Sequence, residues 1–291
     1  MFQRLAKIIL LSVCCPGPLF AAPAINSPYP GLGEQAVITI IIDDIGIRRD
    51  LSERALRLPG TVTYAFLPHS PYGHDLAEMA YQDDKEIILH LPMQPLGGRR
   101  VDEGALTQQQ NQQQFLATLR DDLQRIPHIS GVNNHMGSLL TQKSQQMQWL
   151  MQELAQHSDL YFIDSRTSPN SVGYKQARRQ GLSSLRRDIF LDNDITIPAI
   201  NRQFMKLLEI ARRKGSAVAI GHPYPETLIY LEKILPALPL LGVKLLSATD
   251  LIVHKTRISK ARQMTLPLQT AELNNPVSPS RTSPAPPNLV R

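Results

Sequence analysis

The chain has 291 residues, 42% of them hydrophobic, which suffices for one large domain with a buried core. Its formal net charge is +6, but Arg4 and Lys7 contribute +2 and the stretch after Lys255 contributes +4. The body between them is therefore neutral. A neutral body excludes binding to a nucleic-acid backbone as the main role, because that binding needs a positively charged surface.

The first residues have the layout of a cleavable signal peptide. Two basic residues precede an apolar run over 8–20, and alanines follow it. We predict a signal over 1–24 that is removed on export to the periplasm. The run contains prolines and is shorter than the roughly 20 residues of a spanning helix, so no permanent membrane span is expected. A lipid-modified Cys14 or Cys15 is the alternative.

Both cysteines of the sequence lie inside this predicted signal. The mature chain would then have no disulfide and no thiolate ligand. Any metal must be bound by histidine, aspartate or glutamate.

After a short lead-in rich in proline and glycine over 25–36, one domain is predicted over 37–257. From 258 to 291 the sequence turns to Gln, Asn, Ser, Thr and Pro. This composition predicts a disordered tail, because it offers too little apolar surface to offset the entropy of ordering.

Within the domain, short β-branched runs alternate with longer stretches of helical spacing. The runs cover 37–42, 62–67, 86–89, 130–133, 160–163, 185–191, 217–220 and 243–246. Helical spacing is found over 109–125, 144–157, 200–214 and 226–235. The alternation predicts parallel strands with crossover helices, arranged either as a distorted α/β barrel of about seven strands or as a doubly wound sheet.

We favour the barrel because strand after strand ends in a polar residue. These residues are Asp43, Asp44, His69, His90, His135, Asp164 and His222. In a barrel all C-terminal strand ends converge on one face and build the active site, whereas an open sheet would spread them along an edge.

Two adjacent carboxylates, Asp43 and Asp44, leave a fully apolar strand just before Gly46. Side chains alternate along a strand, so both reach one site only where the strand ends and the chain begins to turn. One carboxylate can then bind a metal while the other remains free as a base. A helix N-cap or a solvated turn is the alternative.

His90 and His135 each follow a strand, so both imidazoles are expected at the barrel mouth. A structural histidine is the alternative for His90, and an ordinary loop is the alternative for His135. Together with Asp44 they would offer two nitrogens and one oxygen to a single divalent ion such as zinc. Asn134 and Ser138 flank His135 and are candidates for orienting a ligand or binding substrate.

Asp164 and Arg166 follow another strand, where Asp164 would orient Arg166 or a histidine; a surface salt bridge is the alternative. His222 follows the run over 217–220 and is a candidate general acid at the barrel mouth.

Taken together, the motifs resemble the divergent polysaccharide deacetylase family, relatives of the NodB-type carbohydrate deacetylases with a distorted α/β barrel. The resemblance covers roughly residues 37–252. It rests on IDDIG at 42–46, HLPMQP at 90–95, NNHMGS at 133–138, FIDSRTS at 162–168, RDIFLDN at 187–193 and IGHPYPET at 220–227.

The resemblance implies a catalytic base at Asp43, a metal ligand at Asp44 and a general acid at His222. The relatives carry two metal-binding histidines four residues apart; here His90 is the first and Gln94 stands in place of the second. We expect His135 to supply the missing ligand from the next strand, with Gln94 as the weaker candidate.

The function expected from this resemblance is metal-assisted removal of acetyl groups from an N-acetylated or O-acetylated envelope glycan. An inactive glycan-binding or scaffold protein on the same barrel is the second hypothesis, and another metal-dependent hydrolase or lyase is the third. A base at Asp43 together with an acid at His222 distinguishes the first hypothesis from the second, because pure binding needs neither; spacing leaves the third open.

Overall fold

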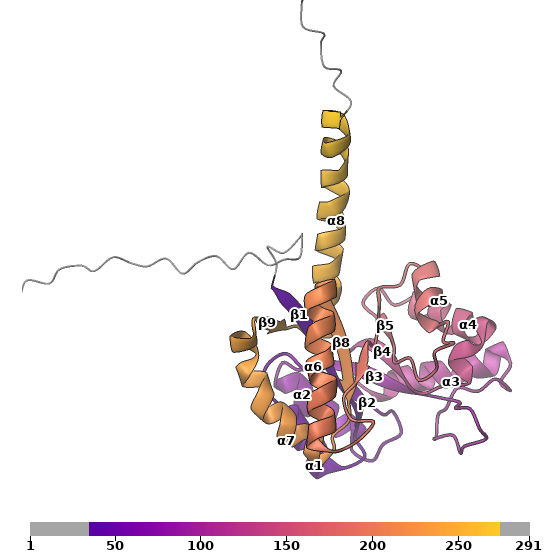
Figure 1. Cartoon of the computed structure of the whole chain (residues 1–291). Coiled ribbons are helices and arrows are strands. Elements are labelled where there is room, and N and C mark those ends of the chain that lie inside the picture. The colour runs from indigo at the N-terminus through magenta and orange to yellow at the C-terminus, as the bar shows by residue number, and fades with distance from the viewer. Residues whose placement is uncertain (1–34, 274–291) are drawn as a thin grey trace, which may run out of the picture. The chain divides into compact units, whose positions relative to one another are not determined.

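The computed structural model describes residues 35–273 (Figure 1). The predicted signal peptide, the lead-in up to residue 34 and residues 274–291 of the predicted tail lie outside the described residues. The strands are β1 (Ala36–Ile45), β2 (Thr63–Phe66), β3 (Glu86–Met93), β4 (Ile129–Met136), β5 (Tyr161–Asp164), β6 (Ser184–Arg186), β7 (Ile189–Phe190), β8 (Ser216–Gly221) and β9 (Val243–Leu245).

The α-helices are α1 (Arg49–Leu56), α2 (Gly73–Gln82), α3 (Gln112–Arg125), α4 (Ser144–Leu154), α5 (Gly173–Arg179), α6 (Ile197–Lys214), α7 (Pro225–Ile234) and α8 (Ala248–Leu273). Two 3₁₀ helices, η1 (Leu140–Gln142) and η2 (Leu235–Leu241), complete the described elements. No described helix is both long and apolar enough to cross a membrane.

All strand pairs are parallel, in the order β6-β5-β4-β3-β2-β1-β8-β7, with β9 paired beside β1. The two ends of this path, β6 and β7, are separated along the chain only by Arg187 and Asp188. The Arg187 N–H donates to the Asp164 carbonyl on β5, and the Asp188 N–H donates to the Val218 carbonyl on β8. One short stretch of chain thus borders both edges, and the predicted distorted α/β barrel is confirmed.

The single strand predicted over 185–191 is split in this structure. Its first part pairs with β5 as β6, and its second part pairs with β8 as β7. The chain changes partner between them, which breaks a continuous β-branched run into two short strands.

Successive side chains along each strand face opposite sides of the sheet, so the buried apolar residues form two separate cores. One cluster gathers residues from six strands, including Val37 and Ile41 of β1, together with Ala248 and Leu251 of α8. The larger cluster contains the intervening residues of β1, such as Ile38 and Ile40, with apolar residues of the helices. The first cluster therefore fills the barrel, and the second lies between the sheet and its surrounding helices.

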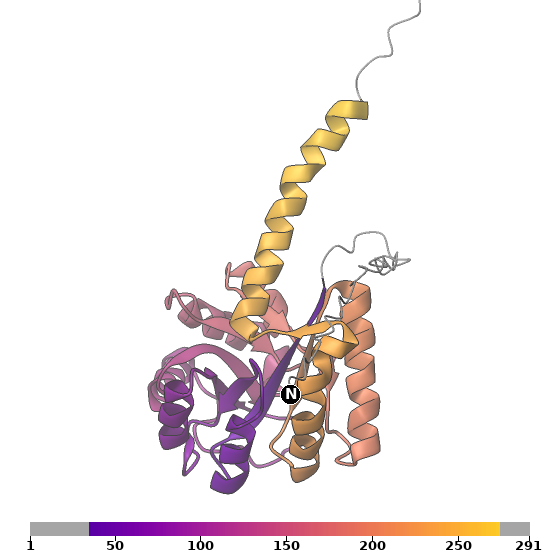
Figure 2. The same ribbon diagram turned by 90° about the vertical axis from the view of Figure 1, so that its left-hand side faces the viewer.

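Helix α8 begins at the end of the barrel where the strands start, and its later turns lead away from the other helices (Figures 1 and 2). Residues 258–273 continue this helix, which differs from the disordered tail predicted from residue 258. The physical reason is local: residues 260–264 read Lys-Ala-Arg-Gln-Met, all strong helix formers, and they extend a helix already anchored in the barrel.

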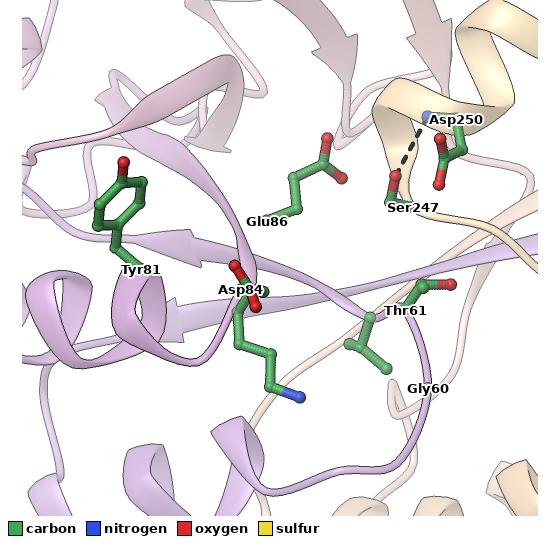
Figure 3. A pocket seen from close by; sticks show the side chains of 9 residues that line it. Gly60, Thr61, Tyr81, Asp84, Glu86, Ser247 and Asp250 are labelled. Atoms are coloured by element: carbon green, nitrogen blue, oxygen red, sulfur yellow. Dashed lines mark hydrogen bonds between the residues drawn. The ribbon is translucent and has the colours of Figure 1, made fainter.

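The carboxylate of Glu86, at the start of β3, joins α8 to the barrel. It accepts hydrogen bonds from the Ala248 N–H at 2.7 Å and the Thr249 N–H at 2.9 Å, which are free donors in the first turn of α8. Thr63 and Tyr161 donate their hydroxyls to the same carboxylate from inside the barrel. Figure 3 shows Glu86 directed toward the start of α8, in a pocket of about 360 Å³.

We predict that Glu86→Ala lowers the free energy of unfolding by about 2–3 kcal/mol, because charge-assisted hydrogen bonds are lost and buried donors are left without a partner. Asp250→Ala is the matched control, since this carboxylate lies in the same pocket and its side chain makes no hydrogen bond among the described contacts. Its effect should stay below about 1 kcal/mol. Urea unfolding of both variants checks this, and equal losses would contradict the assigned role.

Candidate metal centre

The backbone at the end of β1 brings two adjacent carboxylates to the same place. Asp43 continues the inward-facing series of Val37, Thr39 and Ile41, and its side chain is buried. Asp44 would face outward by alternation, but its φ of 58° places it in the left-handed region, which aspartate tolerates better than most residues. The turn therefore begins at Asp44 itself, before Gly46, and both carboxylates lie at the barrel mouth.

The structure brings Asp44, His90 and His135 together. Asp44 Oδ1 lies 3.2 Å from His90 Nε2 and 3.1 Å from His135 Nδ1, and the two nitrogens are 3.0 Å apart. Ligand atoms of a tetrahedral zinc ion, bound at 2.0–2.1 Å, would be separated by about 3.3 Å. This triangle is thus close to the spacing that a single small divalent ion requires.

The outer ring nitrogens decide which atoms face the centre of the triangle. Asn133 donates its amide to Asp43 Oδ1 at 2.7 Å, so its carbonyl oxygen is left to accept from His90 Nδ1, also at 2.7 Å. His90 Nε2 then carries a lone pair toward the centre.

His135 is oriented in the same manner by Asp102. Its Nε2 lies 2.9 Å from Asp102 Oδ2, a carboxylate that can only accept, so Nδ1 carries the lone pair toward the centre. Asp44 Oδ1 is buried and has no hydrogen-bond partner among the described residues. In these neutral tautomers three acceptors face one another, so their centre attracts positive charge, and a cation fits this arrangement.

The pKa values of Asp44 and His90 are shifted by the charges of their neighbours in this cluster. Burial would raise the pKa of Asp44, but the neighbouring imidazoles of His135 and His90 outweigh it and hold the pKa well below its usual range. Burial would lower the pKa of His90, yet the carboxylates of Asp43 and Asp44 raise it. Both pKa shifts mean that an ionised Asp44 beside a positively charged group is favoured at this site.

Asp43 occupies a different position from the three clustered residues. Its Oδ2 lies 3.6 Å from His90 Nε2, and its Oδ1 accepts the Asn133 amide. Burial raises the pKa of Asp43, partly opposed by the charges of His90 and His222. A carboxylate with a raised pKa is better suited to accept a proton than an ordinary one.

His222 faces the same centre from the end of β8, with Nε2 4.0 Å from Asp44 Oδ2. Its Nδ1 lies 2.9 Å from Asp192 Oδ1, and Asp192 Oδ2 accepts from the His222 backbone N–H and the Thr227 hydroxyl. Burial would lower the pKa of His222, but the Asp192 carboxylate raises it to about 9. Asp192 therefore favours the protonated form of the imidazole, in which Nε2 is a donor.

Asn134 and Asp164 face away from the barrel interior. Asn134 accepts the Ser165 N–H and donates to the Met136 carbonyl, so it ties the loops after β4 and β5 together. Asp164 accepts from the Arg166 backbone N–H, the Ser171 hydroxyl and the Tyr174 N–H. It shapes the loop after β5 and contacts the backbone of Arg166 rather than its side chain.

Ser138 and Gln94 hold the long loop after β3. Ser138 accepts the Leu96 N–H through its hydroxyl, and Gln94 accepts the Gln108 N–H through its side-chain carbonyl. The side-chain carbonyl of Gln94 is thus used by the loop, whereas His135 lies in the cluster with Asp44 and His90.

A cleft of about 260 Å³ lies beside His135 and is lined by Asp102, Glu103 and His69 among others. The His69 side chain lines this cleft and does not join the metal centre, because its Nε2 lies 2.8 Å from the buried Asp122 carboxylate on α3. His135 is thus partly exposed to solvent on the side of this cleft.

Four residues of the site were not assigned by the sequence analysis: Asn133, Asp102, Arg187 and Asp192. Asn133 could have been found by alternation, since it lies two residues before His135 and so on the same face of β4. Arg187 donates to the carbonyls of Ser165 and Arg166, and burial together with Arg166 lowers its pKa to about 10. Asp102 lies in a long loop, where no periodic signal was available.

Comparisons with known proteins identify the family of the chain. The sequence pattern of the divergent polysaccharide deacetylases matches residues 40–252. The chain is 34% identical over 202 residues to the uncharacterized protein YibQ of Escherichia coli K12, covering 69% of this chain and 63% of that protein. It therefore spans less than two thirds of the length of that relative.

An uncharacterized protein of Haemophilus influenzae is 36% identical over 205 residues, covering 70% of this chain and 73% of that protein. The crystal structure of the uncharacterized protein ATU2773 from Agrobacterium tumefaciens shares the fold, with a TM-score of 0.72, 22% identity, and coverage of 77% of this chain and 92% of that one. The motifs at the barrel mouth and the match over 40–252 together assign the family: the chain belongs to the divergent polysaccharide deacetylases.

Proposed function

We propose that this chain is a metal-dependent hydrolase that removes acetyl groups from an N-acetylated or O-acetylated glycan of the cell envelope. The observation that carries the proposal is the convergence of Asp44, His90 and His135 with a buried carboxylate, Asp43, and a second imidazole, His222, at one barrel mouth. Glycan as the substrate class is drawn from the family. Export to the periplasm is drawn from the predicted signal peptide.

Asp44, His90 and His135 would hold the ion, and two nitrogens with one oxygen suit zinc while leaving a fourth position open. When bound there, a divalent ion supplies a water of lowered pKa and polarises the acetyl carbonyl. Asn133 and Asp102 support this role, because each fixes the tautomer of one ligand imidazole.

Asp43 and His222 divide the proton transfers between them. Asp43 accepts the proton of the attacking water, and its raised pKa makes it a stronger base than an ordinary aspartate. His222 donates a proton from Nε2 to the departing nitrogen or oxygen, while Asp192 holds the ring in place through Nδ1. A substrate acetyl group would enter along the cleft beside His135.

An inactive glycan-binding or scaffold protein is the second candidate. Gln94 favours it, because it replaces the second histidine of the usual motif and holds a loop instead. Metal analysis of the purified chain, combined with acetate release from acetylated chitooligosaccharides and other envelope glycans, separates the two. Bound metal with acetate release supports the hydrolase, whereas bound metal without acetate from any glycan supports the binding protein.

We predict that His135→Ala lowers metal content from about one ion per chain to below about a tenth, because only two protein ligands remain. Gln94→Ala is the control and should keep its metal, since the side-chain oxygen of Gln94 accepts the Gln108 N–H instead. Atomic emission spectroscopy measures the metal content of both variants after dialysis. Full metal content in His135→Ala would show the ligand assignment to be wrong.

We predict that Asp102→Ala weakens zinc binding by about 10- to 100-fold, since the ring of His135 loses the acceptor that fixes its tautomer. Glu103→Ala, a change of the neighbouring and more exposed carboxylate, should leave the affinity unchanged. Competition with a chromogenic chelator measures both, and equal affinities in the two variants would rule out this role of Asp102.

We predict that Asp43→Asn retains its metal but loses acetate release by about 10²- to 10⁴-fold, because the amide cannot accept the proton of the water. Metal content and turnover are measured on the same preparation. Activity retained within about three-fold would remove Asp43 as the base.

A further inference from the structure

A second polar pocket, of about 170 Å³, lies at the end of the barrel opposite the metal centre. It is bordered by the first residues of β6 and β8, Ser184 and Ser216, by Lys214 at the end of α6, and by Lys255 on α8. The metal centre is built from the other ends of the strands, so the two sites share no residue.

Three cations from three different elements line this pocket, against one carboxylate. Lys214 Nζ pairs with Asp188 Oδ1 at 3.2 Å, while Asp188 Oδ2 is already used to accept the Val218 N–H. Arg186 lies over the Tyr174 ring at 5.5 Å, and Lys255 donates to the Ser216 hydroxyl, a neutral partner, at 3.1 Å. Asp188 balances one cation, and a charge of +2 remains.

The cations are close enough to affect one another. Partial burial, together with the charges of Lys214 and Arg186, lowers the pKa of Lys255, although Asp188 acts in the opposite direction. An anion between the three would relieve this repulsion.

The pocket also holds a hydrogen-bonding group that the protein leaves unused. The Ser184 hydroxyl is buried and has no hydrogen-bond partner among the described residues. Buried hydroxyls are normally satisfied, and a change of the Ser184 rotamer would bring this one to a ligand in the pocket.

We propose that this pocket binds a phosphate monoester. The group carries a charge of about −1.5 to −2 at pH 7, which matches the unbalanced charge of the pocket, and its three oxygens are strong acceptors. Arg186 can meet two oxygens in a fork, Lys214 and Lys255 act as point charges, and Ser184 can add a hydrogen bond after a change of rotamer. The site is separate from the proposed hydrolase centre and does not depend on it.

Inorganic phosphate is the first probe, titrated calorimetrically into the purified chain at low ionic strength. Saturable binding at one site is expected, weakened about ten-fold or more in Lys255→Gln and in Lys214→Gln by loss of a charge-assisted hydrogen bond. Lys206→Gln is the matched control, because it removes the same charge from an exposed position on α6 outside the pocket and should bind as the parent does. Circular dichroism establishes that each variant is folded.

Vesicles distinguish the source of the phosphate group. Vesicles of phosphatidylcholine containing phosphatidic acid, a phosphomonoester lipid, are compared with phosphatidylcholine alone by sedimentation. Lysine-dependent sedimentation with the first kind indicates a lipid headgroup, whereas phosphate binding without sedimentation indicates a soluble phosphate ester. No binding of inorganic phosphate, or equal binding by Lys255→Gln and Lys206→Gln, would overturn the proposal.

Discussion

The arrangement of the barrel mouth depends on one constraint: three acceptor atoms, Asp44 Oδ1, His90 Nε2 and His135 Nδ1, face each other within 3.0–3.2 Å. Lone pairs at such distances repel unless a cation lies between them. The hydrogen bonds of Asn133 and Asp102 favour this state, because they accept the outer ring protons and leave the inner nitrogens as acceptors. The three residues therefore form a candidate site for a positive ion, with Asp43 and His222 beside it.

The fold supplies this convergence through two features of its backbone. Parallel strands bring their C-terminal ends to one face, so β1, β3, β4 and β8 can contribute residues that are distant in sequence. The positive φ of Asp44 then interrupts the alternation of β1, so that Asp43 and Asp44 reach the same mouth. At the opposite end of the barrel, Glu86 accepts two hydrogen bonds from the start of α8. The candidate metal centre and the attachment of the last helix therefore lie at opposite ends of the barrel.

Sequence reasoning was most successful where a periodic pattern or a strand end carried the signal. The alternation of runs predicted the barrel, and the polar strand ends predicted which residues gather at its mouth. It was least successful where contacts are made by loops or depend on the face of a strand: Asp102 is brought to His135 by a long loop, and Asn133, not Asn134, shares the inward face. The helix over 258–273 was missed because polar composition was given more weight than helix propensity.

The most direct test of the central claim is a crystal structure of the chain grown with zinc, with anomalous data collected at the zinc edge. The account predicts a single strong peak within about 2.0–2.2 Å of Asp44 Oδ1, His90 Nε2 and His135 Nδ1. A peak bound by other side chains, or none at this position with zinc in excess, would contradict it.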